Sequence, residues 1–180
     1  MGYIEETGAA QHLRDARITT IYEGTTGIQA NDLIGRKMMR DRGAAALILL
    51  GEVREIERVL AARDEPELVA LHAAIARAAK TMEQAGRWLL ERGAANPVAA
   101  GAAAVNLVHI FGLTIGGALL ARSALRAADL LAAGEGNRIF LQEKMAVARF
   151  FAGQILPEAW GRLEAVLDAE HSALQLYPYA

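Results

Sequence analysis

An apolar stripe in residues 66–92 constrains the fold of this chain more than any other feature. Its members are Leu68, Leu71, Ile75, Ala78, Met82, Ala85 and Leu89. Spacings that alternate between three and four residues place all of them on one face of a helix, and such a face is buried against other helices. Pro66 suits the first turn of this helix and Gly93 suits its end. The stripe therefore predicts a long helix in a bundle and carries no chemistry of its own.

A second stretch, residues 97–121, contains no Asp, Glu, Lys or Arg. It is long enough to cross a bilayer, so a span or a partner contact is one interpretation. However, the stretch is rich in Ala and Gly, which contribute little to membrane insertion, and it contains polar residues such as Asn106 and Thr114. This composition favours the other interpretation, a buried central helix of the bundle with no membrane span.

The remaining pattern predicts an all-α fold, an antiparallel helical bundle preceded by a short N-terminal helix-loop-helix segment. Pro157 is expected to bend the last helix, and no strand-like alternation of useful length occurs. The first residues are irregular and polar, so we divide the chain into domains at residues 1–43 and 44–180. The predicted helices cover about 5–15, 27–40, 44–62, 66–92, 97–133 and 138–172, with a loop through Tyr22, Glu23 and Gly24, a break at 41–43 and an extended tail from 176.

Composition excludes several classes of function. Hydrophobic residues make up 53% and charged residues 22% of the chain, which is typical of a folded protein. A net charge of −2 with mixed signs gives no nucleic-acid-binding surface. Cysteine is absent and the four histidines are scattered, so neither a thiolate nucleophile nor a metal site is expected. The first residues have no signal-peptide pattern, and a cytoplasmic location is the expectation.

The chemistry of the chain is concentrated in residues 21–29, where Glu23 stands between an aromatic residue and a glycine. Thr26 and Gln29 have the spacing of a capping box, which predicts a helix from about Gly27. The positive end of a helix stabilises an ionised carboxylate, whereas apolar neighbours destabilise it, and a carboxylate balanced in this way can act as a general base. On spacing alone, the more frequent outcome is a Glu23 with no role beyond its place near a capped helix.

The wider string changes that balance. Arg14-Asp15-Ala16-Arg17-Ile18 followed by Ile21-Tyr22-Glu23-Gly24-Thr25 and Ile28-Gln29 resembles the signature around the catalytic base of acyl-CoA dehydrogenases, the flavoenzymes that desaturate acyl-CoA thioesters. The resemblance runs from Gly2 to Gln29. It implies that Glu23 removes the α-proton of the thioester while a hydride passes to FAD. It also implies substrate contacts from Tyr22 and Gly24, FAD contacts from Thr25, Thr26 and Gly27, and structural ion pairing by Arg14, Asp15 and Arg17.

Residues 5–11 are more similar to the larger bacterial branch of that family, which includes 3-methylmercaptopropionyl-CoA dehydrogenase and carries an additional C-terminal helical domain. The resemblance implies an acyl-CoA substrate, an electron-transfer protein as a possible acceptor, and a homo-oligomer. The family's middle domain and flavin glycines have no counterpart in the chain. We therefore expect a C-terminal fragment of a longer dehydrogenase that neither retains FAD nor turns over alone.

Two other classes stay open. One is a non-catalytic helical bundle that mediates oligomerisation or protein–protein contact, with a vestigial motif segment. The other is a membrane-embedded bundle, which the apolar stretch at residues 97–121 would permit. Loss of α-proton exchange on replacing Glu23 would distinguish an enzyme from a scaffold, and solubility without detergent would exclude the membrane bundle.

Overall fold

A computed structural model describes residues 4–22 and 24–176. Within these ranges the chain is helical and contains no strand, which confirms the all-α prediction. Three of the elements, η2, η3 and η4, are π-helical turns that continue the α-helix before them. The elements are η1 Glu5–Thr7, α1 Ala9–Tyr22, α2 Thr26–Asn31, η2 Asp32–Met39, α3 Ala44–Ala61, α4 Pro66–Trp88, η3 Leu89–Gly93, α5 Pro97–Ala133, α6 Arg138–Phe150, η4 Phe151–Ile155 and α7 Glu158–Leu176.

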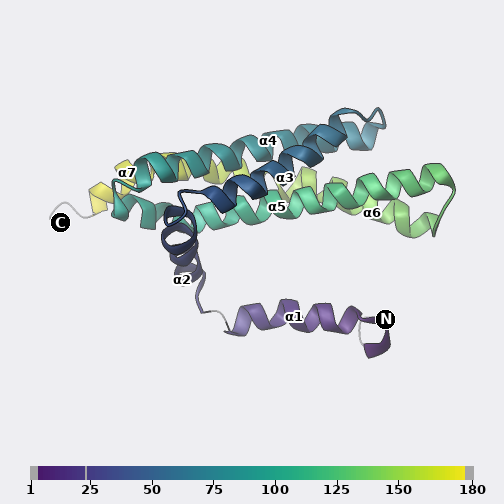
Figure 1. Cartoon of the computed structure of the whole chain (residues 1–180), viewed down its shortest axis with the longest axis horizontal. Helices are drawn as coiled ribbons and strands as arrows, with labels where there is room; N and C mark the ends of the chain where they lie inside the picture. The colour runs from purple at the N-terminus through teal and green to yellow at the C-terminus, as the bar shows by residue number, and fades with distance from the viewer. Residues whose placement is uncertain (1–3, 23, 177–180) are drawn as a thin grey trace.

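The bundle is antiparallel (Figure 1). Helix α3 runs one way, α4 returns, α5 runs out again, and α6 with α7 forms the second return. Helix α5 is the central member and packs against α4, α6 and α7. Helix α2 stands across one end of the bundle, and α1 lies apart from it.

The predicted stripe on α4 forms the spine of the core. Every one of its members is buried, from Leu68 at one end to Leu89 at the other. The stripe passes through both apolar clusters of the bundle, one around Leu71 and Ile75 and the other around Met82 and Leu89. Because a helix face of this kind is removed from water along its whole length, it sets the position of the neighbouring helices.

The charge-free stretch is the first two thirds of α5. This helix is long and apolar enough to cross a membrane by length and composition. It nevertheless lies at the centre of the bundle, where small residues such as Ala103 and Ala118 are buried and allow close approach of its neighbours. Its buried Thr114 donates a hydrogen bond to the carbonyl of Ala78 on α4 at 3.5 Å. Core packing therefore accounts for its apolar composition.

Two predicted boundaries are wrong. Helix α1 continues to Tyr22, although the prediction ended it near Asp15, because no Gly or Pro interrupts the chain before Gly24. The long last helix is interrupted at the proline that was expected to bend it, since η4 continues α6 to Ile155 and α7 starts only after Pro157. Proline removes an N–H group and clashes with the preceding turn, so a continuous helix is disfavoured there. Leu176, where the predicted extended tail begins, is still the last residue of α7, and residues 177–180 lie outside the described residues.

The break at residues 41–43 is confirmed and connects η2 to α3. The Asp41 carboxylate accepts hydrogen bonds from the N–H groups of Gly43 at 2.9 Å and Ala45 at 3.0 Å. Gly43 has φ of 78°, and a β-carbon there would lie 2.8 Å from Cδ1 of Leu90. The turn therefore needs glycine for its backbone and for its contact with η3.

The turn between α3 and α4 is held by a charged network. The Arg63 guanidinium binds Glu65 at 2.5 Å and Asp129 of α5 at 2.7 Å. Its hydrogen bond to Glu65 lowers the pKa of that carboxyl to about 2. This network links the turn to the central helix at the end of the bundle opposite α2.

Candidate functional site

The segment that carries the predicted site residues joins α1 to α2 and so connects α1 to the bundle (Figure 1). Tyr22 is the last residue of α1 and its side chain is 84% exposed. Gly24 has φ of 80° and Thr25 is extended, so the chain turns sharply before α2. Thr26 and Gly27 are the first two residues of α2. Glu23, the predicted catalytic base, lies outside the described residues.

Thr25, and not Thr26, caps helix α2. The Thr25 hydroxyl oxygen accepts a hydrogen bond from the N–H of Ile28 at 3.3 Å, and the Thr25 carbonyl accepts one from the N–H of Gln29 at 3.1 Å. Thr26 is already helical, so the capping box predicted for Thr26 and Gln29 is wrong by one residue. The predicted helix itself is confirmed, and a threonine hydroxyl still accepts a hydrogen bond from a free N–H group at its N-terminus.

The backbone of this segment is open to a ligand. A β-carbon added at Gly24 would meet nothing within 4 Å, and one at Gly27 would meet only Oγ1 of Thr25 at 4.0 Å. The first N–H groups of a helix have no carbonyl partner within the helix and favour an anionic group. Thr25, Thr26 and Gly27, the residues predicted to contact the cofactor, are exposed.

The downstream side of the segment is fixed to the bundle. Ala30, Ile34 and Met38 form a buried stripe along α2 and η2. They belong to the same apolar cluster as Trp88 of α4 and Phe111 of α5. The start of α2 is therefore held in place by core packing, even though Ile28 in its first turn is exposed.

The upstream side has no comparable support. Helix α1 makes its main contacts with η1, and its large side chains Leu13 and Ile18 are exposed. Local polar bonds hold this part together: Arg14 binds Glu5 at 2.7 Å, and Gln11 donates to Asp15 at 2.7 Å. The structural ion pairing predicted for Arg14 is present. The segment with the predicted site is thus anchored on one side and open on the other.

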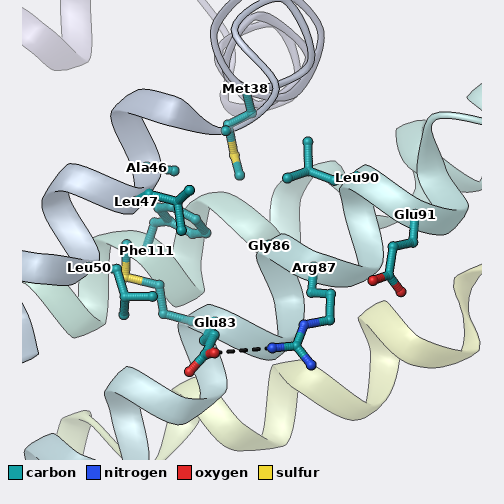
Figure 2. Close-up of a pocket in the computed structure, with 12 residues that line it drawn as sticks. Met38, Ala46, Leu47, Leu50, Glu83, Gly86, Arg87, Leu90, Glu91 and Phe111 are labelled. Carbon is teal, nitrogen blue, oxygen red and sulfur yellow. Dashed lines mark hydrogen bonds and ion pairs between the residues drawn. The ribbon is translucent and has the colours of Figure 1, made fainter.

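A separate apolar cavity, which the sequence patterns did not indicate, lies between η2, α3, α4 and α5 (Figure 2). Its volume is about 230 Å³, and its apolar walls include Met38, Leu50 and Phe111. At its edge Glu83 pairs with Arg87 at 3.1 Å. None of the described residues predicted for the site lines this cavity.

Gly86 is a sequence feature that accompanies this cavity. A side chain at Gly86 would come within 3.8 Å of Cζ of Phe111 and 3.9 Å of Cε of Met38, so the glycine leaves space that a larger residue would fill. Small residues are frequent on every helix of this bundle, and their spacing alone does not distinguish close packing from a void. Among the described residues, no group of three or more His, Asp or Glu side chains is arranged to hold a metal ion.

Two protein-family models match the chain. One, described as "Acetyl-CoA dehydrogenase C-terminal like", covers residues 49–177. The other, described as "Acyl-CoA dehydrogenase, C-terminal domain", covers residues 1–39 and therefore includes the motif segment. The two matches together cover most of the chain and meet near the turn between η2 and α3.

Curated relatives show the same similarity. The chain is 41% identical over 181 aligned residues to 3-methylmercaptopropionyl-CoA dehydrogenase of Ruegeria pomeroyi, an alignment that covers 97% of this chain and 29% of the relative. It is 30% identical to the broad-specificity linear acyl-CoA dehydrogenase FadE5 of Mycobacterium tuberculosis, covering 97% of this chain and 30% of the relative. A stretch of 29 residues is 66% identical to the mitochondrial short-chain specific acyl-CoA dehydrogenase of Bos taurus, covering 16% of this chain and 7% of that relative. The chain thus spans about three tenths of the length of the first two.

Proposed function

Because the chain belongs to the acyl-CoA dehydrogenase family, we propose that it supplies one wall of the active site of a longer FAD-dependent acyl-CoA dehydrogenase. The observation that carries the proposal is the placement of Tyr22 and residues 24–27, on either side of Glu23, on an exposed segment with a fixed downstream side and an open upstream side. Such a segment can face a second structural unit that completes the site. The length of the relatives, more than three times the aligned part, supports the existence of such a unit.

In this proposal the substrate is an acyl-CoA thioester and Glu23 is the catalytic base. Its carboxylate takes the proton from the α-carbon, and the electrons of that C–H bond form the new double bond of a trans-2-enoyl-CoA. The backbone N–H of Glu23 polarises the thioester carbonyl and so acidifies the α-proton. FAD, when bound, accepts the hydride that leaves the β-carbon. Tyr22 and Gly24 would contact substrate, and Thr25, Thr26 and Gly27 would contact FAD.

The proposed division of labour follows the two predicted domains. Residues 1–43 would complete the catalytic helical domain, and residues 44–180 would form an additional helical bundle domain. The change from one family model to the other between residues 39 and 49 supports this boundary. We further propose a cytoplasmic homo-oligomer, without a membrane span or nucleic-acid partner, that passes electrons to an electron-transfer protein.

Replacing the carboxylate tests the catalytic role. In the longer enzyme, Glu23→Gln should lower turnover by roughly 10²–10⁴-fold, because that is the usual contribution of a positioned general base. Exchange of the substrate α-proton with deuterated water should be lost, while the visible absorbance of bound FAD stays unchanged. The matched control is Glu52→Gln, since Glu52 is an exposed carboxylate on α3 far from the motif in the chain.

Unchanged turnover and α-proton exchange in Glu23→Gln would eliminate Glu23 as the base. A variant that loses FAD would instead show that this residue helps to hold the cofactor. Turnover would then be measured per molecule of enzyme that still carries FAD. The alternative function, a non-catalytic bundle for oligomerisation or protein–protein contact, is favoured by one specific observation. Helix α6 carries a row of large exposed apolar side chains.

A further inference from the structure

The apolar cavity between η2, α3, α4 and α5 has the walls of a ligand site (Figure 2). Three of the residues that line it, Met38, Met82 and Phe111, are buried, so the cavity reaches beneath the surface of the bundle. Leu50 and Leu90 continue the apolar wall toward the opening. The cavity therefore lies within one packed unit, and the helices that form the core also set its shape.

Two of the π-helical segments meet at this cavity. Near the end of η2 the carbonyl of Met38 accepts a hydrogen bond from the N–H of Gly43, five residues later, at 2.8 Å. Leu89 and Ala94 make the same five-residue bond at 3.0 Å in η3, which supplies Leu90 to the wall. π-Helical turns are rare and occur frequently at functional sites. Their convergence on one cavity is a second observation, independent of its volume, that points to a ligand.

The size and the lining of the cavity define the ligand by its chemistry. The volume is about 230 Å³. An engineered apolar cavity of about 150 Å³ stays dry and binds benzene, so a larger one with apolar walls has room for a larger apolar molecule. At about 30 Å³ for a heavy atom, the volume of one water molecule in the liquid, it holds roughly eight heavy atoms. The unbranched side chains of Met38 and Met82 adapt easily to a flexible occupant, which favours a short alkyl chain.

The charged groups at the opening disfavour an anionic ligand. The Glu83 carboxylate binds Arg87 at 3.1 Å and Arg54 at 2.9 Å, so both guanidinium groups already have an acidic partner. Glu91 also lines the opening and forms no ion pair within the part of the chain that the structure describes. A carboxylate brought there would meet two other carboxylates, which repel it. A hydroxyl group carries no charge and can donate to a carboxylate or accept from a guanidinium.

We propose that this cavity binds an uncharged alkyl molecule of roughly eight heavy atoms, with its hydroxyl group at the opening, as in a primary alcohol of six or seven carbons. None of the described residues of the predicted catalytic site lines the cavity, so the proposal depends neither on Glu23 nor on FAD. Met38 stands near the end of the continuous helix that begins at Thr26. An occupant would therefore also hold α2 and η2 more firmly against α4 and α5.

Methyl NMR of the chain with 1-hexanol tests the site directly. Nuclear Overhauser effects should connect the alkyl protons to the ε-methyl groups of Met38 and Met82, and not to that of Met145, which packs on the other apolar cluster. The dissociation constant should be about 0.1–1 mM, as expected when about six CH₂ groups leave water. Hexanoate at pH 7 should bind at least tenfold more weakly, because the carboxylates at the opening repel it.

Gly86→Leu should close the cavity from inside. A β-carbon at Gly86 would lie 3.8 Å from Cζ of Phe111 and 3.9 Å from Cε of Met38, which are ordinary contacts, so a longer side chain projects into the space between them. The variant should bind 1-hexanol at least tenfold more weakly than the native chain. Gly51→Leu is the matched control and should bind normally, because Gly51 is exposed on α3 and an added β-carbon meets nothing within 4 Å.

A second variant keeps the proposal testable if Gly86→Leu does not fold. Leu50→Ala widens the cavity and should shift its preference from 1-hexanol to 1-octanol, and an unchanged preference would count against the site. An absence of contacts to Met38 and Met82, an equal loss of binding in Gly51→Leu, or hexanoate that binds as tightly as 1-hexanol would overturn the proposal.

The longer enzyme distinguishes a ligand site from a hollow that another part of the protein fills. It should bind 1-hexanol with the same contacts to Met38 and Met82 and with an affinity within about threefold of that of the chain alone. Binding to the chain but not to the longer enzyme would show that another segment occupies the cavity, and the proposal would then be wrong. Loss of turnover in Glu23→Gln, or its absence, has no bearing on this result, so the two proposals fail separately.

Discussion

Two adjacent threonines in this chain have different tasks, and only the backbone conformation separates them. Thr25 is extended and its hydroxyl oxygen accepts the N–H of Ile28, so it ends the turn and starts α2. Thr26 has a helical backbone, and in the proposed site its hydroxyl is available to the cofactor. Replacing each in turn separates the cost of the cap from any contribution to binding.

Thr25→Ala should lower the free energy of unfolding by about 1 kcal/mol, the usual cost of losing a threonine cap. Thr26→Ala is the control and should change it by less than about 0.5 kcal/mol, because an exposed side chain away from the cap is removed. Chemical denaturation measures both values. Hydrogen exchange at the Ile28 amide should accelerate only in Thr25→Ala, and equal acceleration in the two variants would contradict the assignment of the cap.

Helix α5 shows how glycines on one element serve different purposes. A β-carbon at Gly117 would lie 3.3 Å from Cδ2 of Leu156 and 3.4 Å from Cε1 of Phe151. The absence of a side chain therefore lets the segment between α6 and α7 pack closely against α5. Gly112 on the same helix is exposed and has nothing within 4 Å of the same position. Gly117 and Gly112 therefore form a matched pair for substitution, because one is closely packed and the other faces open solvent.

Gly117→Leu should destabilise the chain by about 1–3 kcal/mol, because it overpacks the contact of α5 with Leu156 and Phe151. Gly112→Leu should leave stability unchanged or raise it by up to about 1 kcal/mol, since leucine has a higher helix propensity than glycine. Urea denaturation of both variants checks the difference. Similar losses in the two variants would show that backbone freedom, and not packing against η4, determines the glycine at position 117.

The whole chain combines a well-packed bundle with an N-terminal segment that the bundle does not enclose. The core clusters extend from α2 to α7, while α1 packs mainly on η1 and exposes Leu13 and Ile18. The chain spans about three tenths of the length of its relatives, and in the proposed function the rest of such a protein would cover α1. A site anchored on one side predicts weak cofactor binding by the 180 residues alone.

The purified 180-residue chain should therefore bind no FAD after incubation with excess cofactor and gel filtration. Its folded state is verified in parallel by circular dichroism, so that loss of binding is not confused with unfolding. The longer enzyme serves as the positive control and should carry visible flavin absorbance. Retained flavin that acyl-CoA bleaches in the isolated chain would show that residues 1–180 contain a complete site.

Much of the fold could be predicted from residue spacing. The stripe from Leu68 to Leu89 determines one face of α4, and the break at Asp41 to Gly43 follows from a carboxylate that binds the turn and a glycine that accepts its positive φ. Local signals were less reliable where two neighbouring residues could do the same task. Thr25 and Thr26 are equally good caps in isolation, and the first glycine that can end α1, Gly24, comes nine residues after the predicted end at Asp15.

The motif from Arg14 to Gln29 was sufficient, by sequence alone, to identify the family, because residue identity in a short segment carries chemistry directly. The site residues that the motif implies stay a prediction. The burial pattern, too, was encoded in the spacing of apolar residues. Only the tertiary structure decided that α2 is fixed to the core while α1 is not, that a cavity lies beside Gly86, and that α6 keeps an apolar face outside the bundle. Those features depend on which faces meet across the bundle, and periodicity within one helix does not specify its neighbour.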